Sequence, residues 1–340
     1  ECGSRNNSPS ANAGSDQIVS CSSLNGAQII LDGSGSSDSD GDALTHTWTW
    51  AGGSATGVNP AIMLPYGATT FTLTVDDEKG GSSQDTVVVT VKDDLPPSTS
   101  SSITAISGNN GWYKSDVNLN LTSTDNCSGS RDLTYVIDDV TTTVAGATAN
   151  VLISDDGKHS LNFYAVDNAG NTEQAKTLEI KIDKTAPVIS ITGVSDGATY
   201  ALGSVPVAAY TVIDATSGVA TSSAALTGGD GLGLGTFTSS VTATDNAGNT
   251  ITSTATYTVI ATPEGLIALI QQMLASGQID NAGIANSLIS KVENAMSAGN
   301  DNTADNILQA FINQVSAQGQ HIDSGAAAIL INAANYIISH

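Results

Sequence analysis

Aspartates in tight turns are the residues of this sequence with the clearest chemical potential. The pentapeptide DNAGN occupies residues 167–171 and again 245–249, each time after an alternating apolar run, and SSDSDGD occupies 36–42. Asp and Asn side chains bond the local backbone and Gly accepts a positive φ, so these segments predict turns. The same side chains supply the oxygen ligands that Ca²⁺ prefers. The sequence leaves two interpretations open, a turn alone or a turn that also binds a metal.

The position of these aspartates favours the metal interpretation. Asp76, Asp167 and Asp245 hold the same place in three successive predicted hairpins, 91 and 78 residues apart, which is the length of one seven-stranded immunoglobulin-like sandwich. In an immunoglobulin-like sandwich the B–C and F–G loops emerge at the end that the chain reaches first, the leading end. We therefore expect acidic side chains from two loops and a linker to meet at each leading end. The linker before the second end brings both Asp93 and Asp94. The predicted structural Ca²⁺ ligands are Asp38, Asp40, Asp42, Asp76 and Asp77 at the first end, Asp125 and Asp167 with the linker residue Asp94 at the second, and Asp183, Asp214 and Asp245 at the third.

The overall charge excludes several classes of partner. Ten Lys and Arg residues against 33 Asp and Glu residues give a net charge of −23. Such a chain repels nucleic acid and anionic lipid, so cations are its natural counterpart. No apolar stretch is long enough for a membrane-spanning helix, and we predict no membrane insertion.

Catalytic motifs are not found. The four histidines show no HExxH spacing, and no Gly-x-Ser-x-Gly elbow lies between a predicted strand and a helix. The carboxylates lie in polar turns without the apolar pocket that raises the pKa of a catalytic acid. We predict that the chain is not an enzyme.

Hydrophobic patterning predicts a mainly β protein with a helical end. Strand, Gly turn and strand recur at 70–93, 161–182 and 238–260, and Pro-containing linkers at 94–100 and 183–187 separate the repeats. From Pro263 the apolar period lengthens, and four short helices are predicted, three of them preceded by Asp or Asn caps. We predict three tandem immunoglobulin-like β-sandwiches and a small α-helical bundle, with domains at 1–93, 94–185, 186–262 and 263–340.

Three parts of the sequence resemble known families. Residues 11–17 (ANAGSDQ), 31–50 (LDGSGSSDSDGDALTHTWTW) and 72–81 (TLTVDDEKGG) resemble the PKD domain. The next two repeats are similar to bacterial Ig-like domains of surface adhesins, through WYKSDVNLNLTSTDNCSG, VDNAGN and IDKTAPVI. The resemblance implies an extracellular protein and Ca²⁺ at the domain junctions.

The helical end resembles the FIMAH domain found at the C-termini of secreted bacterial proteins. Phe311, Ile312 and His321 fall at the residues that name the family, while Val315 replaces its Met. Because a core in a unit under 80 residues is marginal, we expect this bundle to pack on a sandwich or another subunit, and we assign Phe311 and Ile312 as interaction residues.

Three cysteines suit an oxidising, extracellular location, where disulfides persist. The predicted disulfide is Cys2–Cys21, which would tie the N-terminal residues to the first sandwich. Cys127 is left over as a free thiol or a partner in an intermolecular bond.

The predicted function is a non-catalytic, extracellular structural or adhesive protein at the bacterial surface, as a Ca²⁺-stiffened stalk or a subunit of a filament that self-associates or binds another surface protein. The alternative is the accessory tail of a secreted polymer-degrading enzyme that binds polysaccharide. A sugar-binding surface would need exposed aromatics, and only Trp48, Trp50 and Trp112 are available as tryptophans.

Overall fold

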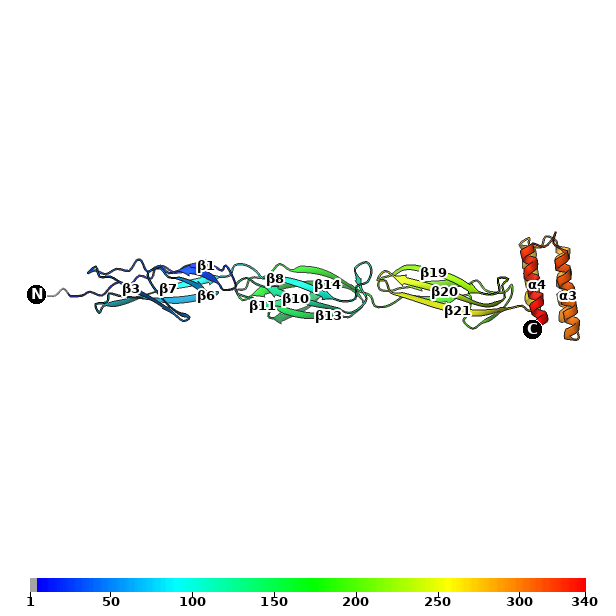
Figure 1. Cartoon of the computed structure of the whole chain (residues 1–340), viewed down its shortest axis with the longest axis horizontal. Coiled ribbons are helices and arrows are strands. Elements are labelled where there is room, and N and C mark those ends of the chain that lie inside the picture. The colour runs from blue at the N-terminus through cyan, green and yellow to red at the C-terminus, as the bar shows by residue number, and fades with distance from the viewer. Residues whose placement is uncertain (1–4) are drawn as a thin grey trace. The chain divides into compact units, whose positions relative to one another are not determined.

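The structure is a computed structural model that describes residues 5–340. By backbone contacts the chain divides into two compact units. The first comprises Glu1–Ile106 and Ser115–Ile182, and the second comprises Ser107–Lys114 and Asp183–His340. The fold class predicted from the sequence is confirmed: three immunoglobulin-like sandwiches precede four helices (Figure 1).

The first sandwich is built from seven strands in two sheets. One sheet has the order β1-β7-β6-β3-β4, in which β1 runs parallel to β7, and the other pairs β2 with β5. The strands are β1 (Gln17–Ser20), β2 (Ala27–Ile30), β3 (Thr45–Trp50), β4 (Gly53–Thr56), β5 (Ala61–Leu64), β6 (Gly67–Asp76) and β7 (Ser82–Lys92). Alternate residues of β6 and β7 point inward, so Phe71 and Leu73 pack with Trp48 in a core closed to solvent.

The second sandwich is also built from two sheets, but its first strand belongs to the smaller one. One sheet has the order β13-β10-β8, and the facing sheet contains the run β12-β11-β14-β15. The strands are β8 (Ser98–Thr104), β10 (Val117–Thr124), β11 (Ser130–Ile137), β12 (Val140–Ala145), β13 (Thr148–Ile153), β14 (Gly157–Asp167) and β15 (Lys176–Ile182). Strand β9 (Trp112–Tyr113) lies in the segment 107–114 that belongs to the second unit.

The third sandwich has fewer strands than the other two. Strand β16 (Val188–Thr192) pairs with β18 (Ala209–Ile213), and the facing sheet has the order β17-β21-β20-β19. The strands of that sheet are β17 (Thr199–Ala201), β19 (Val219–Gly228), β20 (Gly235–Asp245) and β21 (Thr250–Ile260). Within the described residues, β18 pairs with β16 alone.

Each of the four helices begins at a polar cap. They are α1 (Pro263–Ala275), α2 (Ala282–Met296), α3 (Asp301–Ala317) and α4 (Ser324–Ser339). The side chains of Thr262, Asn281, Asn300 and Asp323 accept hydrogen bonds from backbone N–H groups of the first turns. These bonds satisfy donors that would otherwise lack partners, which is why the chain turns into a helix at these four positions.

The helices and the third sandwich share one hydrophobic core. Leu202 and Val259 from the sandwich belong to the same buried cluster as Leu269 from α1 and Phe311 from α3. Gly203 has φ +84°, and a Cβ there would come within 3.3 Å of Leu269 backbone atoms, so a residue without a side chain allows this close approach. The expectation that the helical bundle packs on a sandwich is therefore confirmed.

Candidate metal sites at the leading ends of the sandwiches

The structure gathers aspartates into three groups, one at each predicted end. Within every group, one carboxylate oxygen from each residue lies within 4.8 Å of the others. The groups are Asp38, Asp40 and Asp42; Asp93, Asp125 and Asp167; and Asp183, Asp214 and Asp245. Two of them combine a linker residue with the B–C and F–G loops of the sandwich that follows, which is the arrangement expected from the sequence.

At the leading end of the second sandwich, Asp167 is fully buried and Asp93 is 7% exposed. The carboxylate of Asp167 accepts hydrogen bonds from the backbone N–H and the side-chain amide of Asn171, both at 2.8 Å. Asp93 accepts the N–H of Ser128 at 3.0 Å. Asp125 accepts the N–H of Gly129 at 2.8 Å through Oδ2, while its buried Oδ1 has no hydrogen-bond partner.

At the leading end of the third sandwich, Asp183 is fully buried and Asp245 is 1% exposed. The backbone N–H and the amide of Asn249 donate to Asp245, both at 2.8 Å. Asp183 accepts the N–H of Ser217 at 3.1 Å, and Asp214 accepts the N–H of Gly218 at 2.6 Å.

The two sites match residue for residue. Asn171 donates its amide to the backbone oxygens of Asp93 and Leu95, and Asn249 donates to those of Asp183 and Thr185. The last residue of each DNAGN motif thus ties the hairpin carboxylate to the incoming linker. The second residue, Asn168 or Asn246, bonds two carbonyls of the B–C loop in both sites. The repeated pentapeptide is a turn, and it also fixes the linker and two loops together.

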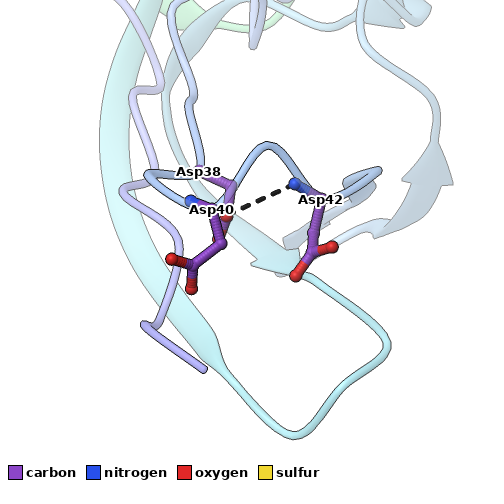
Figure 2. Close-up of side chains that lie close together, drawn as sticks. All are labelled: Asp38, Asp40 and Asp42. Atoms are coloured by element: carbon purple, nitrogen blue, oxygen red, sulfur yellow. Dashed lines mark hydrogen bonds between the residues drawn. The ribbon is translucent and has the colours of Figure 1, made fainter. Parts of the chain in front are cut away.

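The group at the leading end of the first sandwich differs, because it comes from one loop. Figure 2 shows Asp38, Asp40 and Asp42 on this loop, where the N–H of Asp42 donates to Asp38 at 3.4 Å. The buried Oδ2 of Asp38 has no partner. Asp42 pairs with Lys79, and the backbone and side-chain amides of Asn7 donate to Asp40 at 2.7 and 2.9 Å. A basic side chain and the N-terminal segment therefore already satisfy part of this group.

The groups at the leading ends of the second and third sandwiches each include a linker residue, and we call them the first and the second linker site. The geometry of both sites fits Ca²⁺. This ion binds oxygens at about 2.3–2.6 Å, so two oxygens on opposite sides of it are about 5 Å apart, which a 4.8 Å group accommodates. The partners described above are neutral amides, which bring no positive charge to the three carboxyl groups of each site. Buried like charges are costly without a cation. The unpartnered Oδ1 of Asp125 is a further acceptor that such an ion would satisfy.

The protonation state of Asp93 also suits a calcium ligand. Burial acts to raise the pKa of Asp93, but hydrogen bonds with Ser128, Leu95 and Asp125 together outweigh it and hold the pKa below its ordinary value. The carboxyl group is therefore ionised at neutral pH, as a calcium ligand must be.

Three predicted ligands do not join the groups. Asp94 is exposed and accepts a hydrogen bond from Ser20 at 3.3 Å, so Asp93 is the linker residue that reaches the site. Asp77 is buried in its own turn, where it accepts bonds from Gly81 and Asn6, and Asp76 accepts the N–H of Glu78. Turn bonds occupy the carboxylates of Asp76 and Asp77, Asp94 is bonded to Ser20, and none of the three belongs to a group of aspartates.

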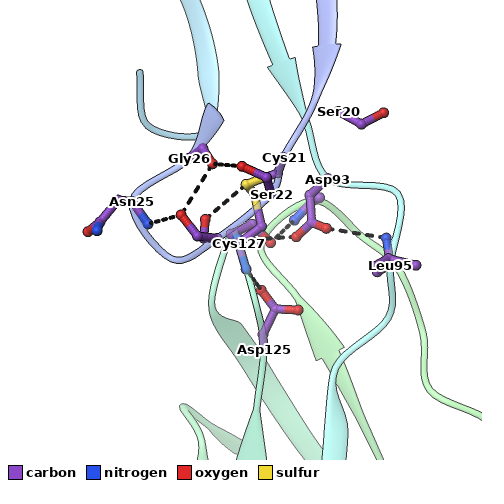
Figure 3. The surroundings of a disulfide bond; sticks show 12 residues. Ser20, Cys21, Ser22, Asn25, Gly26, Asp93, Leu95, Asp125 and Cys127 are labelled. Atoms are coloured by element: carbon purple, nitrogen blue, oxygen red, sulfur yellow. Dashed lines mark hydrogen bonds between the residues drawn. A yellow bond between two sulfur atoms is a disulfide. The ribbon is translucent and has the colours of Figure 1, made fainter. Parts of the chain in front are cut away.

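The predicted Cys2–Cys21 disulfide is wrong. Cys21 is bonded to Cys127, 106 residues further on, with a Cα–Cα distance of 6.0 Å, while Cys2 lies outside the described residues. Figure 3 shows the bond beside Asp93 and Asp125, and the N–H of Cys127 donates to Asp125 at 2.9 Å. The disulfide thus joins the first sandwich to the B–C loop that carries a candidate calcium ligand.

The predicted interaction residues lie inside the protein. Phe311 is fully buried and Ile312 is 8% exposed, and both belong to the core shared with the third sandwich. They hold α3 in place and present no surface to a partner. The tryptophans also form no exposed stacking platform, because Trp48 and Trp112 are buried and Trp50 packs on Phe71 at 5.1 Å.

Sequence reasoning missed Asn171, Asn249 and the partner of Cys21. The two asparagines were visible as the final residue of each DNAGN motif, four positions after the aspartate. The disulfide carried no signal in the sequence, because its two cysteines belong to different sandwiches.

Comparisons with known proteins identify the two ends of the chain. Residues 6–91 match the PKD domain, and residues 263–339 match the FIMAH domain. A search of curated proteins found no similar sequence. No helix in the described residues is long and apolar enough to cross a membrane.

Similarities to solved structures are weak. A 1.5-MDa bacterial ice-binding adhesin is 15% identical over 75% of this chain and 99% of that one, with a TM-score of 0.30. The extracellular domain of protocadherin gamma B4 is 17% identical over 76% of this chain and 50% of that one, with a TM-score of 0.33. A Saccharophagus degradans protein associated with carbohydrate metabolism is 24% identical over 26% of each chain, with a TM-score of 0.22.

These scores carry no argument about function, and this chain spans only about a quarter of the length of the Saccharophagus protein. The domain types matched are non-catalytic. The chain carries a PKD domain at its N-terminal end and a FIMAH domain at its C-terminal end, with immunoglobulin-like β-sandwiches between them.

Proposed function

We propose that this chain is an extracellular structural or adhesive protein of the bacterial surface whose linkers are fixed by Ca²⁺. The observation that supports this most is the duplication of one carboxylate arrangement, residue for residue, at the leading ends of the second and third sandwiches. A turn needs one aspartate, whereas each of these two ends brings together three, from a linker and two loops. The repeated pairing with Asn171 and Asn249 makes a chance grouping a poor explanation.

Calcium at these sites would be held by Asp93, Asp125 and Asp167 in one case and by Asp183, Asp214 and Asp245 in the other. It would neutralise the buried charges and bond the incoming linker to the sandwich. A fixed linker has fewer orientations than a free one, so a chain loaded with Ca²⁺ would be stiffer at each linker. Stiffness of this kind suits a stalk or a filament subunit that transmits force or spaces a binding surface.

The acidic composition supports an extracellular role with cations as partners, and the PKD match agrees with it. We further propose that the protein associates with itself or with another surface protein. Polysaccharide binding is a poorer proposal, because the tryptophans that would stack on sugars are packed against the protein.

Thermal unfolding of the full chain tests the role of calcium. At Ca²⁺ about 100-fold above its dissociation constant, an occupied site stabilises the folded state by roughly 2.7 kcal/mol. We expect EGTA to lower the transition of the third sandwich in the wild-type chain but to change that of Asp245→Asn far less. An unchanged wild-type transition in EGTA would refute calcium at this site. Light scattering of the same samples measures self-association, and a monomeric mass in both Ca²⁺ and EGTA would refute association of the chain with itself.

A further inference from the structure

In the third sandwich no strand of the described chain pairs with the second edge of β18, whereas the corresponding strands of the other two sandwiches, β2 and β10, pair with β5 and β13. In the second sandwich, β13 pairs antiparallel with β10 on the side opposite β8, with Val117 facing Ile153 and Thr122 facing Thr148. In the first sandwich, β5 pairs with β2 in the equivalent place. Strand β18 corresponds to β10 because β16 pairs with it as β8 pairs with β10, but its other edge has no strand within the described residues.

The chain is too short here to supply that strand. Residues 138–156, which include β12 and β13, connect β11 to β14 in the second sandwich, and residues 51–66, which include β4 and β5, connect β3 to β6 in the first. Residues 229–234 alone connect β19 to β20. Both sheets of the third sandwich therefore end early on the same side, at β18 and at β19.

An apolar groove remains where the strand is missing. It has a volume of about 350 Å³ and lies between β18 and the sheet of β19 and β20. Its lining includes Ala209 and Tyr210 on β18, Ala225 and Leu226 on β19, and Val241 on β20. Leu226 is 59% exposed, and every residue of β19 is exposed. On β18 itself Tyr210 is 37% exposed, whereas Leu119 and Leu121 of the corresponding strand β10 are at most 1% exposed.

The neighbouring sandwich shows what chemistry fills such a groove. The inward residues of β13 are Ala149, Val151 and Ile153, all buried, and the residues between them are exposed. The groove-lining residues of the third sandwich are uncharged in a chain of net charge −23. An occupant must therefore be an extended, uncharged strand with small or branched apolar residues at alternate positions.

We propose that the groove binds one β-strand of a partner polypeptide with this alternating pattern, in antiparallel register with β18. Main-chain hydrogen bonds to the free edge would provide affinity, and the groove would select the alternate side chains. A second copy of this chain is a poorer occupant, because its described segment before β1, residues 5–16, carries no alternating apolar run and its apolar strands already belong to sheets. The proposal does not depend on calcium.

The test uses the full-length chain and a synthetic peptide of residues 147–154, ATANVLIS, which contains β13. Bound peptide should slow amide hydrogen exchange by about tenfold or more at alternate residues of 209–213, those whose N–H groups point away from β16, because these groups become hydrogen-bonded. The control peptide carries Val151→Asp and Ile153→Asp and should give no protection, since charge cannot enter the apolar groove.

Two variants of the protein locate the binding. Ala209→Trp fills the groove and should weaken peptide affinity by about tenfold or more, which corresponds to about 1.4 kcal/mol. Thr221→Trp adds the same side chain to an exposed position of β19 outside the groove lining and should leave affinity unchanged. The proposal would be overturned if the β13 peptide gave no protection, or if both peptides protected equally. It would also be overturned if both variants bound the peptide equally, or if the chain without peptide formed a dimer through β18 and β19.

Discussion

Cys21 and Cys127 are covalently joined although they belong to different sandwiches, and Cys127 also donates its N–H to the candidate calcium ligand Asp125. In the third sandwich, Thr216 stands at the position equivalent to Cys127, between Asp214 and Gly218. The two linker sites thus have equivalent carboxylates, and only the first carries a disulfide next to its B–C loop aspartate. The second linker site is therefore a natural control for the first.

We expect the double variant Cys21→Ser and Cys127→Ser to lower the Ca²⁺ affinity of the first linker site and to leave that of the second linker site unchanged. The disulfide restricts the B–C loop, so its loss raises the entropy that binding must remove. Calcium titration followed by NMR signals of Gly129 and Gly218 measures the two sites separately. If the Gly129 signal reports the same Ca²⁺ affinity in the wild-type chain and in the cysteine variant, the disulfide does not contribute to calcium binding.

Asn249→Ala should destabilise the third sandwich even in EGTA. The Asn249 amide bonds the Asp245 carboxylate and the backbone oxygens of Asp183 and Thr185, so its removal leaves acceptors without partners. A loss of about 1–3 kcal/mol is expected from denaturant unfolding. Asn286→Ala, on an exposed face of α2, is the matched control and should stay within about 0.5 kcal/mol. A silent Asn249→Ala would show that the linker is not held in this way.

The pair of His159 and Asp138 should make the second sandwich sensitive to pH. The ring Nδ1 of His159 lies 2.6 Å from the Asp138 carboxylate, and its Nε2 lies 2.9 Å from the Asp155 carbonyl oxygen. Burial acts to lower the pKa of His159, but these bonds outweigh it and raise the pKa above its ordinary value. The hydrogen bond from His159 lowers the pKa of Asp138.

The raised His159 pKa contributes stability that is complete below about pH 6.5 and is lost as pH rises through the folded value. The lowered Asp138 pKa contributes stability that is lost below about pH 4. Asp138→Asn should therefore lower the thermal midpoint of the second sandwich most near pH 5.5 and least near pH 9. A midpoint difference that does not vary between these pH values would contradict the assignment.

Phe311→Ala should destabilise the helices and the third sandwich together. The ring is fully buried in their shared core, and removing a buried aromatic costs about 3–5 kcal/mol. Amide exchange should show faster opening in α3 and near Leu202, with the first sandwich unaffected. Faster exchange confined to the helices would mean that the helices and the third sandwich do not unfold as one cooperative unit.

The sequence predicted the sandwiches, the helices and most of the candidate metal ligands, because each rests on a local signal. Alternation marks the strands, Asn and Asp mark the helix starts, and the repeated Asp167 and Asp245 mark equivalent loops. The topology of a sandwich then places these loops beside the linker at its leading end.

The remaining features depend on relations between distant segments. Asp94 and Asp93 are adjacent in the sequence, and only the path of the backbone decides which one faces Asp125. The pairing of Cys21 with Cys127 depends on how two sandwiches meet. The exposed groove beside β18 depends on a strand that the third repeat does not contain, which is visible only once the register of the other two is known.

Calcium titration of the full chain by isothermal calorimetry tests the central claim most directly. The double variant Asp167→Asn and Asp245→Asn removes one ligand charge from each linker site, and Asp132→Asn, in a surface pair with Arg131, is the matched control. We predict that the wild-type chain and the control bind calcium with the same stoichiometry and that the double variant binds two fewer ions. A wild-type chain that binds no calcium, or a double variant with unchanged stoichiometry, would contradict the account.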